Sequence, residues 1–169
     1  MAATYDLISA ATPAGTTACV FNSLGSYTDL VIQCYFSATV GCDYDLRFNG
    51  DTGTNYYYLQ GSSTASNTFD NASTNAGGSI RIIGAYNSPQ GGADFNAIEI
   101  SLPEYRNSIV KNANYRFGYI SNPASPAANV GFGTGQWRNT AAITSVTIST
   151  TNGNFANGTT INLYGIMAG

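Results

Sequence analysis

The segment Leu46–Tyr56 reads LRFNGDTGTNY, and it decides more about the chain path than any other stretch. An alternating run ends at Phe48 and leads directly into Asn49-Gly50. Asn-Gly favours a type I′ turn, because both central positions of that turn need positive φ. A second turn signal, Asp51-Thr52-Gly53, follows at once. The segment therefore predicts a strand, a tight reversal and a second strand that pairs with the first as a hairpin.

Strand patterns continue on both sides of this segment. In the range 28–36 the apolar residues Leu30, Ile32, Cys34 and Phe36 alternate with more polar ones. No stretch of ten or more residues has helical periodicity, and Gly, Asn, Ser and Pro clusters separate the strands. Strands are expected at 4–9, 17–22, 28–36, 43–48, 55–60, 79–86, 96–102, 114–121, 144–148 and 159–163.

This pattern predicts an all-β fold, an antiparallel jelly-roll-like β-sandwich of roughly 8–10 strands without substantial helix. The length of 169 residues suits a single β-sandwich domain over residues 1–169. Two long stretches, 61–78 and 121–138, read as irregular because small polar residues, Gly and Pro dominate them. Long loops are usually functional, so 121–138 is expected to bind a partner.

The composition is unusually poor in charge. Charged residues make up 9% of the chain, against about 25% in ordinary soluble proteins. Because abundant charge keeps soluble domains apart, the shortage favours assembly with other protein. The chain has no run of basic residues of the kind that binds nucleic acid, and no apolar stretch is long enough for a membrane helix. The N-terminus lacks the features of a signal peptide, so we expect synthesis and retention in a cytosol.

Catalytic residue types are scarce. The chain has no histidine and one lysine, Lys111, which excludes the histidine-dependent triads and metal sites. A carboxylate pair among Asp43, Asp45 and Asp51 could hydrolyse glycosides. However, Asp43 and Asp45 are expected on a solvated strand face that Arg47 neutralises. Their spacing with Asn49 and Asp51 does not fit a calcium-binding loop. We therefore expect no enzyme activity, no cofactor and no metal.

The cysteines Cys19, Cys34 and Cys42 are odd in number and have no metal-ligand spacing. Cys34 and Cys42 could approach each other across a hairpin. Synthesis in a cytosol argues against a disulfide, and small buried apolar side chains are the simpler interpretation.

Aromatic residues are the best candidates for partner contacts. Tyr56, Tyr57 and Tyr58 put tyrosines on both faces of one strand, and Trp137 lies among glycines. Tyrosine and tryptophan are enriched at interfaces and also stack on sugar rings. A tyrosine-rich core is the competing interpretation for some of them. We predict Tyr56, Tyr57, Tyr58 and Trp137 as contact residues, with Trp137 in a loop.

The turn segment also carries a resemblance. Together with Tyr5-Asp6-Leu7-Ile8 and Ile161–Ile166, it resembles small all-β structural proteins of tailed bacteriophages, which occur as capsid cement (decoration) proteins and as head- or tail-fibre domains. The resemblance covers both ends and the first third of the chain, whereas roughly 60–140 does not match. Its recurrent positions imply a fold signature without catalytic role, and they are Arg47, Asn49, Gly50, Asp51, Gly53, Asn55, Tyr56, Leu163, Tyr164 and Gly165.

The resemblance implies a virion structural protein on the capsid surface, made in the host cytoplasm. Its expected role is to cement the head by bridging subunits of the major capsid protein, as a homo-oligomer expected to be a trimer. The alternative is a fibre module that binds a host surface glycan. A secreted lectin and a glycan-degrading enzyme are further alternatives, and neither nucleic acid nor membrane is an expected partner.

Overall fold

The computed structural model describes residues 5–64, 69–83, 95–121 and 127–167. All regular elements in these ranges are strands, and every strand pair is antiparallel. No helix in the described ranges has the length and apolar character to cross a membrane. The strands are β1 (Tyr5–Ala11), β2 (Ala18–Phe21), β3 (Asp29–Phe36), β4 (Tyr44–Phe48), β5 (Tyr56–Thr64), β6 (Phe69–Gly77), β7 (Ile80–Ile83), β8 (Asn96–Leu102), β9 (Lys111–Ser121), β10 (Ala127–Trp137), β11 (Val146–Thr150) and β12 (Thr160–Ile166).

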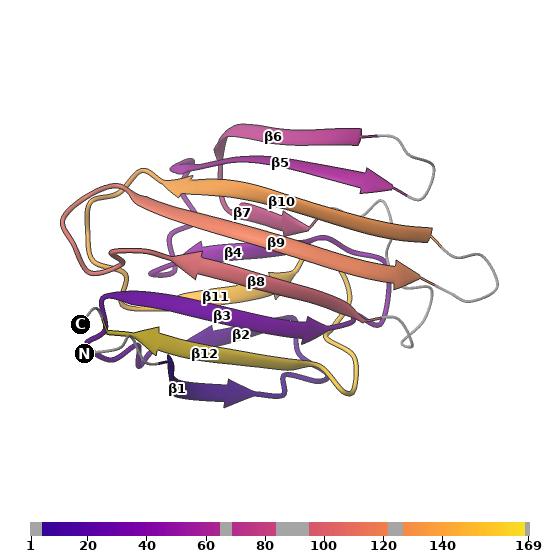
Figure 1. Cartoon of the computed structure of the whole chain (residues 1–169), viewed down its shortest axis with the longest axis horizontal. Coiled ribbons are helices and arrows are strands. Elements are labelled where there is room, and N and C mark those ends of the chain that lie inside the picture. The colour runs from indigo at the N-terminus through magenta and orange to yellow at the C-terminus, as the bar shows by residue number, and fades with distance from the viewer. Residues whose placement is uncertain (1–4, 65–68, 84–94, 122–126, 168–169) are drawn as a thin grey trace.

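The strands form two stacked sheets (Figure 1). The front sheet has eight strands in the order β1-β12-β3-β8-β9-β10-β5-β6, and the back sheet has four in the order β2-β11-β4-β7. The all-β, antiparallel sandwich prediction is confirmed. The predicted number of strands is too low, because the described part of the chain holds twelve.

The order of eight of these strands is that of a jelly roll. When β1–β4, β7, β8, β11 and β12 are numbered one to eight, the two sheets read 1-8-3-6 and 2-7-4-5. The first strand thus pairs with the last and the second with the last but one, as in two interlocked Greek keys. The other four strands are insertions. One pair, β5 and β6, follows β4, and the other, β9 and β10, follows β8, and both pairs extend the front sheet.

The core lies between the sheets and follows the alternation read from the sequence. On β3 the residues Leu30, Ile32, Cys34 and Phe36 are buried, and β4 contributes Tyr44, Leu46 and Phe48 from the opposite sheet. Phe36 and Tyr44 meet across the layers with ring centroids 4.0 Å apart. Alternating apolar residues therefore positioned these strands correctly, because each strand buries one face against the other sheet.

The expectation of long irregular loops at 61–78 and 121–138 is wrong where the structure describes them. They contain β6 and β10, each paired along its length with β5. The glycines of β10 explain the error. A Cβ at Gly133 would lie 2.3 Å from the Tyr115 ring, and one at Gly131 would lie 2.4 Å from the Phe117 ring. These glycines leave room for the aromatic rings of β9, and they do not mark a loop. Residues 65–68, 84–86 and 122–126 of the predicted loops and strands lie outside the described ranges.

Candidate functional site

The Asn49-Gly50 turn forms as predicted, but it does not close a hairpin. Asn49 and Gly50 have φ of 53° and 66°, and the amide of Asp51 donates to the carbonyl of Phe48 at 2.9 Å. The strand before the turn, β4, belongs to the back sheet, whereas β5 belongs to the front sheet. The turn therefore carries the chain from one layer to the other, and the predicted pairing of the two strands is wrong.

The Asn49 side chain joins this corner to the segment before β11. Its amide nitrogen donates to the carbonyl of Ala142 at 2.9 Å. Its oxygen accepts from the amides of Thr144 at 2.7 Å and Ser145 at 3.1 Å. The side chain thus satisfies three backbone groups of a distant segment, which accounts for an asparagine at this turn position.

The Asp51 carboxylate is the centre of the corner. It accepts from the Gly53 amide at 2.8 Å, from Asn55 Nδ2 at 2.9 Å and from Trp137 Nε1 at 2.7 Å. The hydrogen bond from Trp137 contributes most to holding the pKa of Asp51 below its usual range, followed by those from Asn55 and Gly53. Donors that favour the ionised carboxylate stabilise it, so Asp51 is a charged structural anchor.

Two of the four predicted contact residues belong to this anchor. Tyr56 and Trp137 are 0% and 1% exposed and stack near each other, with ring centroids 6.4 Å apart. The Tyr56 hydroxyl accepts from the Phe48 amide at 3.0 Å, and its one proton is shared between the carbonyls of Phe48 and Asp51, each at 3.2 Å. Burial raises the pKa of Tyr56 to about 12. The expectation that Trp137 lies in a loop as a contact residue is wrong, because it ends β10 inside the core.

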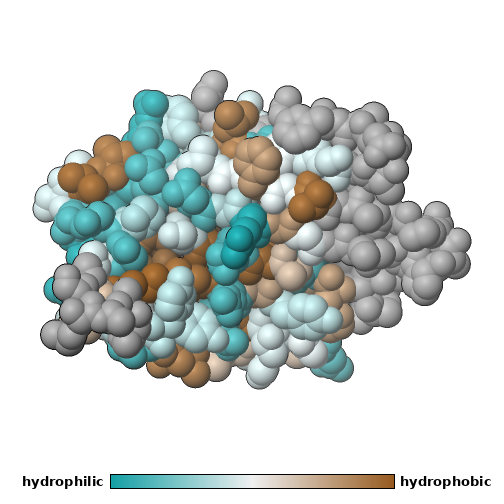
Figure 2. Space-filling view, in the orientation of Figure 1, coloured by the Kyte–Doolittle hydropathy of each residue, from teal (hydrophilic) through white to brown (hydrophobic). Residues whose placement is uncertain are grey.

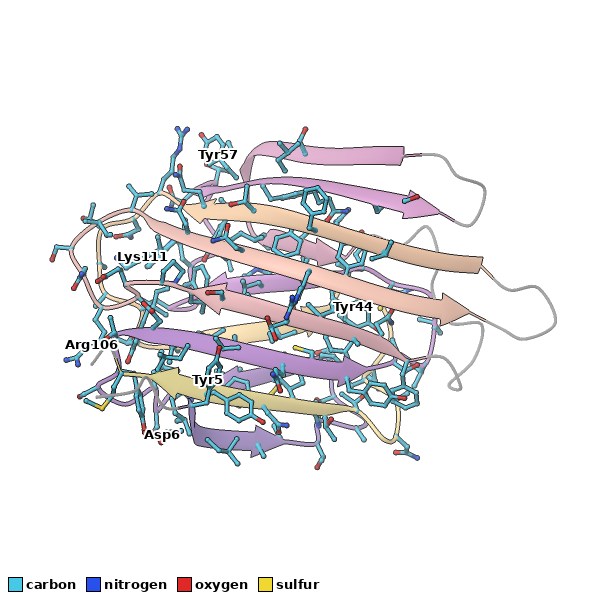
Figure 3. The ribbon with its side chains drawn as sticks, in the orientation of Figure 1. Tyr5, Asp6, Tyr44, Tyr57, Arg106 and Lys111 are labelled. Carbon is cyan, nitrogen blue, oxygen red and sulfur yellow. The ribbon has the colours of Figure 1, made fainter. Side chains whose placement is uncertain are left out.

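The other two tyrosines are both half-buried, and they face opposite sides of β5. Tyr58 is half-buried and packs against the core cluster. Tyr57 points to the outside of the front sheet, and the Arg138 guanidinium lies 3.6 Å from the centre of its ring (Figure 3). A cation over a tyrosine face is an attractive contact. Of the predicted tyrosines, Tyr57 is the one whose side chain lies on the outer face of the front sheet.

The aspartates do not form a catalytic pair on a solvated face. Asp43 and Asp45 are buried to 8% and 6% exposure, which contradicts the expected exposure. Arg81 on the neighbouring strand β7 lies 2.6 Å from Asp43 and 3.8 Å from Asp45, and Arg47 lies 3.7 Å from Asp45. Two arginines thus neutralise the two carboxylates. In the described ranges no three His, Cys, Asp or Glu side chains are grouped as a metal site.

The remaining nucleophilic side chains are enclosed. Lys111 is 1% exposed, and its ammonium donates to the carbonyls of Asn107 and Ile109 at 2.5 Å (Figure 3). No disulfide joins the cysteines, and burial raises the pKa of all three thiols. These groups are positioned for structure, not for reaction with a substrate.

The outer face of the front sheet carries features that the sequence did not reveal. Leu59 on β5 and Val130 and Phe132 on β10 are 57%, 65% and 64% exposed. Leu59 is opposite Thr134, so it lies diagonally beside Phe132, and Val130 is two residues from Phe132 on the same face. The three apolar side chains therefore form one row with Phe132 in the middle. We call them the apolar ridge. Figure 2 looks onto this face, where hydrophobic groups lie among hydrophilic ones. The ridge was missed because 61–78 and 121–138 were interpreted as loops.

A groove of about 520 Å³ opens beside the ridge on the same face. Its lining side chains come from β3, β8, β9, β10 and β12. The outward-facing ones are Gln33, Tyr35, Ala97, Glu99, Arg116, Val130, Thr160 and Asn162.

The comparisons with known proteins add little to this description. No protein-family model and no curated protein matches the chain. Among solved structures, the chain is similar to the E230A variant of fructofuranosidase from Schwanniomyces occidentalis, solved in complex with fructosylnystose. The identity is 11% and the TM-score is 0.41, over 97% of this chain and 34% of that chain. The chain thus spans about a third of that enzyme, and a similarity at this level carries no functional argument.

Proposed function

We propose that this protein is a virion structural protein of a tailed phage that cements the head by bridging neighbouring capsid subunits, with no catalytic role. The observation that carries the proposal is the apolar ridge on the outer face of the front sheet, where its three side chains are 57–65% exposed. Exposed apolar side chains that adjoin one another on a rigid surface mark interaction sites. The shortage of charge, at 9% of residues, supports the same interpretation.

The phage resemblance supports a structural role through what its residues do in the fold. The side chains of Asn49, Asp51 and Tyr56 all bond to the main chain or to side chains of the corner. A signature made of such residues preserves a chain path and performs no chemistry. It is therefore the kind of signature that a structural family would retain.

In the proposed mechanism the ridge joins copies of this chain, expected as a homotrimer, and the oligomer then contacts the major capsid protein. Each copy contributes modest contacts across a subunit joint. Linking the copies raises the effective concentration of the second and third contacts, so the oligomer binds much more tightly than one copy. The cement would act on the capsid surface after synthesis in the host cytoplasm.

The oligomeric state is the first test. Native mass spectrometry of the purified chain should give a trimer. Phe132→Ser should shift it toward monomer, because the ridge loses its largest side chain. Val20→Ser is the matched control, since Val20 is 50% exposed on β2 of the back sheet. A wild-type protein that stays monomeric, or a Phe132→Ser variant that stays trimeric, would contradict self-association through the ridge.

The position on the particle is the second test. Purified virions are labelled with a specific antibody and imaged. Label spread over the head in a copy number comparable to the capsid subunit would support the cement role. Label confined to the tail tip or to sparse fibres would overturn it in favour of receptor recognition, and particles without label would contradict any virion role.

A further inference from the structure

The groove on the front sheet is built from two neighbouring rows of side chains that cross the strands. One row consists of Thr160, Tyr35, Ala97, Gly118 and Val130, each opposite the next on adjacent strands. Because residues two apart on a strand share a face, the second row lies beside the first and faces the same way. This outer face is the one toward the viewer in Figures 1 and 2.

The first row explains why the face is hollow. Ala97 and Gly118 are small, and they lie between the larger side chains of Tyr35 and Val130. Adjacent strands are about 4.8 Å apart, so three strand spacings separate these walls by roughly 14 Å. Tyr35 is 51% exposed, and its ring stacks on Phe95 with centroids 4.5 Å apart and planes 6° apart. The stacking fixes one wall of the groove as a flat aromatic surface.

The second row supplies hydrogen-bonding groups along the side of the hollow. It runs from Asn162 through Gln33 and Glu99 to Arg116, again with each residue opposite the next. The Arg116 and Glu99 side chains form an ion pair at 2.9 Å. The row thus combines carbonyl and carboxylate acceptors with amide and guanidinium donors. All four side chains stand on paired strands, which hold a site more firmly than loops do.

The charge balance of the groove narrows the class of ligand. The one acid and the one base among its lining residues, Glu99 and Arg116, cancel each other. A phosphate-rich polymer needs an excess of positive charge, which is absent here. A purely apolar ligand would leave the polar row without hydrogen bonds. An extended peptide that adds to a sheet binds at an edge strand, whereas this groove crosses central strands.

We propose that this groove binds a neutral saccharide segment, with Tyr35 stacking on the apolar face of one sugar ring and the Asn162-Gln33-Glu99-Arg116 row bonding its hydroxyls. Neighbouring hydroxyls both donate and accept, so they match a row that offers both kinds of group. The volume of about 520 Å³ is in the range of small-ligand sites, which is about 300–1,000 Å³. The proposal does not depend on the cement role, because it concerns a different set of side chains, with only Val130 shared.

The test is a printed array of bacterial and host oligosaccharides, followed by calorimetric titration with the best neutral binder. Tyr35→Ala removes the stacking wall, and Arg116→Ala removes the main donor of the row. Each should weaken binding at least tenfold. Ala97→Leu fills the hollow from an exposed position, so it should abolish binding without touching the core. Tyr5→Ala is the matched control on β1 of the same sheet, opposite Ile166 and outside both rows, and it should bind within twofold of the wild type.

Several results would overturn the proposal. An array on which the wild type retains no neutral saccharide would do so. Binding unchanged by both Ala97→Leu and Tyr35→Ala would place the ligand elsewhere. Retention of anionic saccharides alone, lost at about 1 M salt where charges are screened within about 3 Å, would indicate nonspecific charge attraction. None of these results bears on the oligomer test with Phe132→Ser, so the two proposals fail separately.

Discussion

The corner anchor gives the most direct prediction about stability. Replacing Asp51 with alanine removes the acceptor of Trp137 Nε1, whose side chain is 1% exposed. An unsatisfied buried donor costs about 1–3 kcal/mol, and each of the two more exposed bonds, from Gly53 and Asn55, contributes about 0.5 kcal/mol. We therefore expect Asp51→Ala to lower the free energy of unfolding by about 3 kcal/mol. Native proteins typically have a free energy of unfolding of about 5–15 kcal/mol, so this loss is a large part of the total.

Asp51→Asn separates the charge from the shape of this side chain. With the amide oxygen in place of Oδ2, the variant still accepts from Trp137 and Asn55. The amide nitrogen then faces the Gly53 N–H, so that hydrogen bond is lost together with the charge, and the loss should be about 2 kcal/mol. The pKa of Asp51 is lowered in the folded state. The charge therefore contributes its full stabilisation at pH values above the pKa of Asp51 in the unfolded chain, which is about 4. This stabilisation is lost as the pH falls through the lower pKa that Asp51 has in the folded protein. The difference between wild type and Asp51→Asn should accordingly be largest at neutral pH and vanish in acid.

The assay is urea denaturation followed by fluorescence of Trp137, the only tryptophan in the chain. All proteins are measured at one concentration, because self-association adds to apparent stability. Asp6→Ala is the control, since Asp6 is exposed on β1 (Figure 3). If Asp51→Ala lost no more than Asp6→Ala, the corner would not be an anchor. A wild-type to Asp51→Asn difference that grows in acid would refute the sign of the pKa argument.

Three further changes test the packing. Gly133→Ala places a Cβ 2.3 Å from the Tyr115 ring, so it should destabilise the fold by about 2–3 kcal/mol in the same assay. Tyr56→Phe removes the hydroxyl that bonds the Phe48 main chain, so it should lower the free energy of unfolding by about 1–2 kcal/mol. Tyr57→Phe should leave the free energy of unfolding unchanged. The single lysine, Lys111, is buried, so an amine-reactive reagent should label it only after unfolding, as read by mass spectrometry of the peptide that contains Lys111.

Local chemistry made part of this structure predictable. The alternation on β3 and β4 identified the buried faces, because each strand has one face on the core. The Asn49-Gly50 turn was predictable because positive φ at both positions is a property of those two residues. The turn alone could not reveal whether the next strand stays in the same sheet. That choice depends on Trp137, which is 86 residues from Asp51 in the chain.

The candidate contact residues were harder to predict for the same reason. A tyrosine or tryptophan serves equally well in a core and at an interface. Which of the two it does depends on whether the fold supplies a buried hydrogen-bond partner for its O–H or N–H. Trp137 is in the core because the Asp51 carboxylate satisfies its N–H. Asp43 and Asp45 are buried because Arg81, from a strand distant in sequence, neutralises them. The pattern of β4 alone carries no sign of that arginine.

The positions of the two proposed surfaces follow from the insertions into the jelly roll. Without β9 and β10, β8 would end the front sheet, and Glu99 would face solvent where Arg116 now stands. Without β5 and β10 the ridge of Leu59, Val130 and Phe132 would not exist. Both surfaces therefore depend on strands that the eight-stranded core does not need. A fold shared with another jelly roll then predicts neither surface. Two jelly rolls that share a function should therefore resemble each other in the outward side chains of their inserted strands. Those side chains can differ between proteins while the buried pattern of the core stays the same.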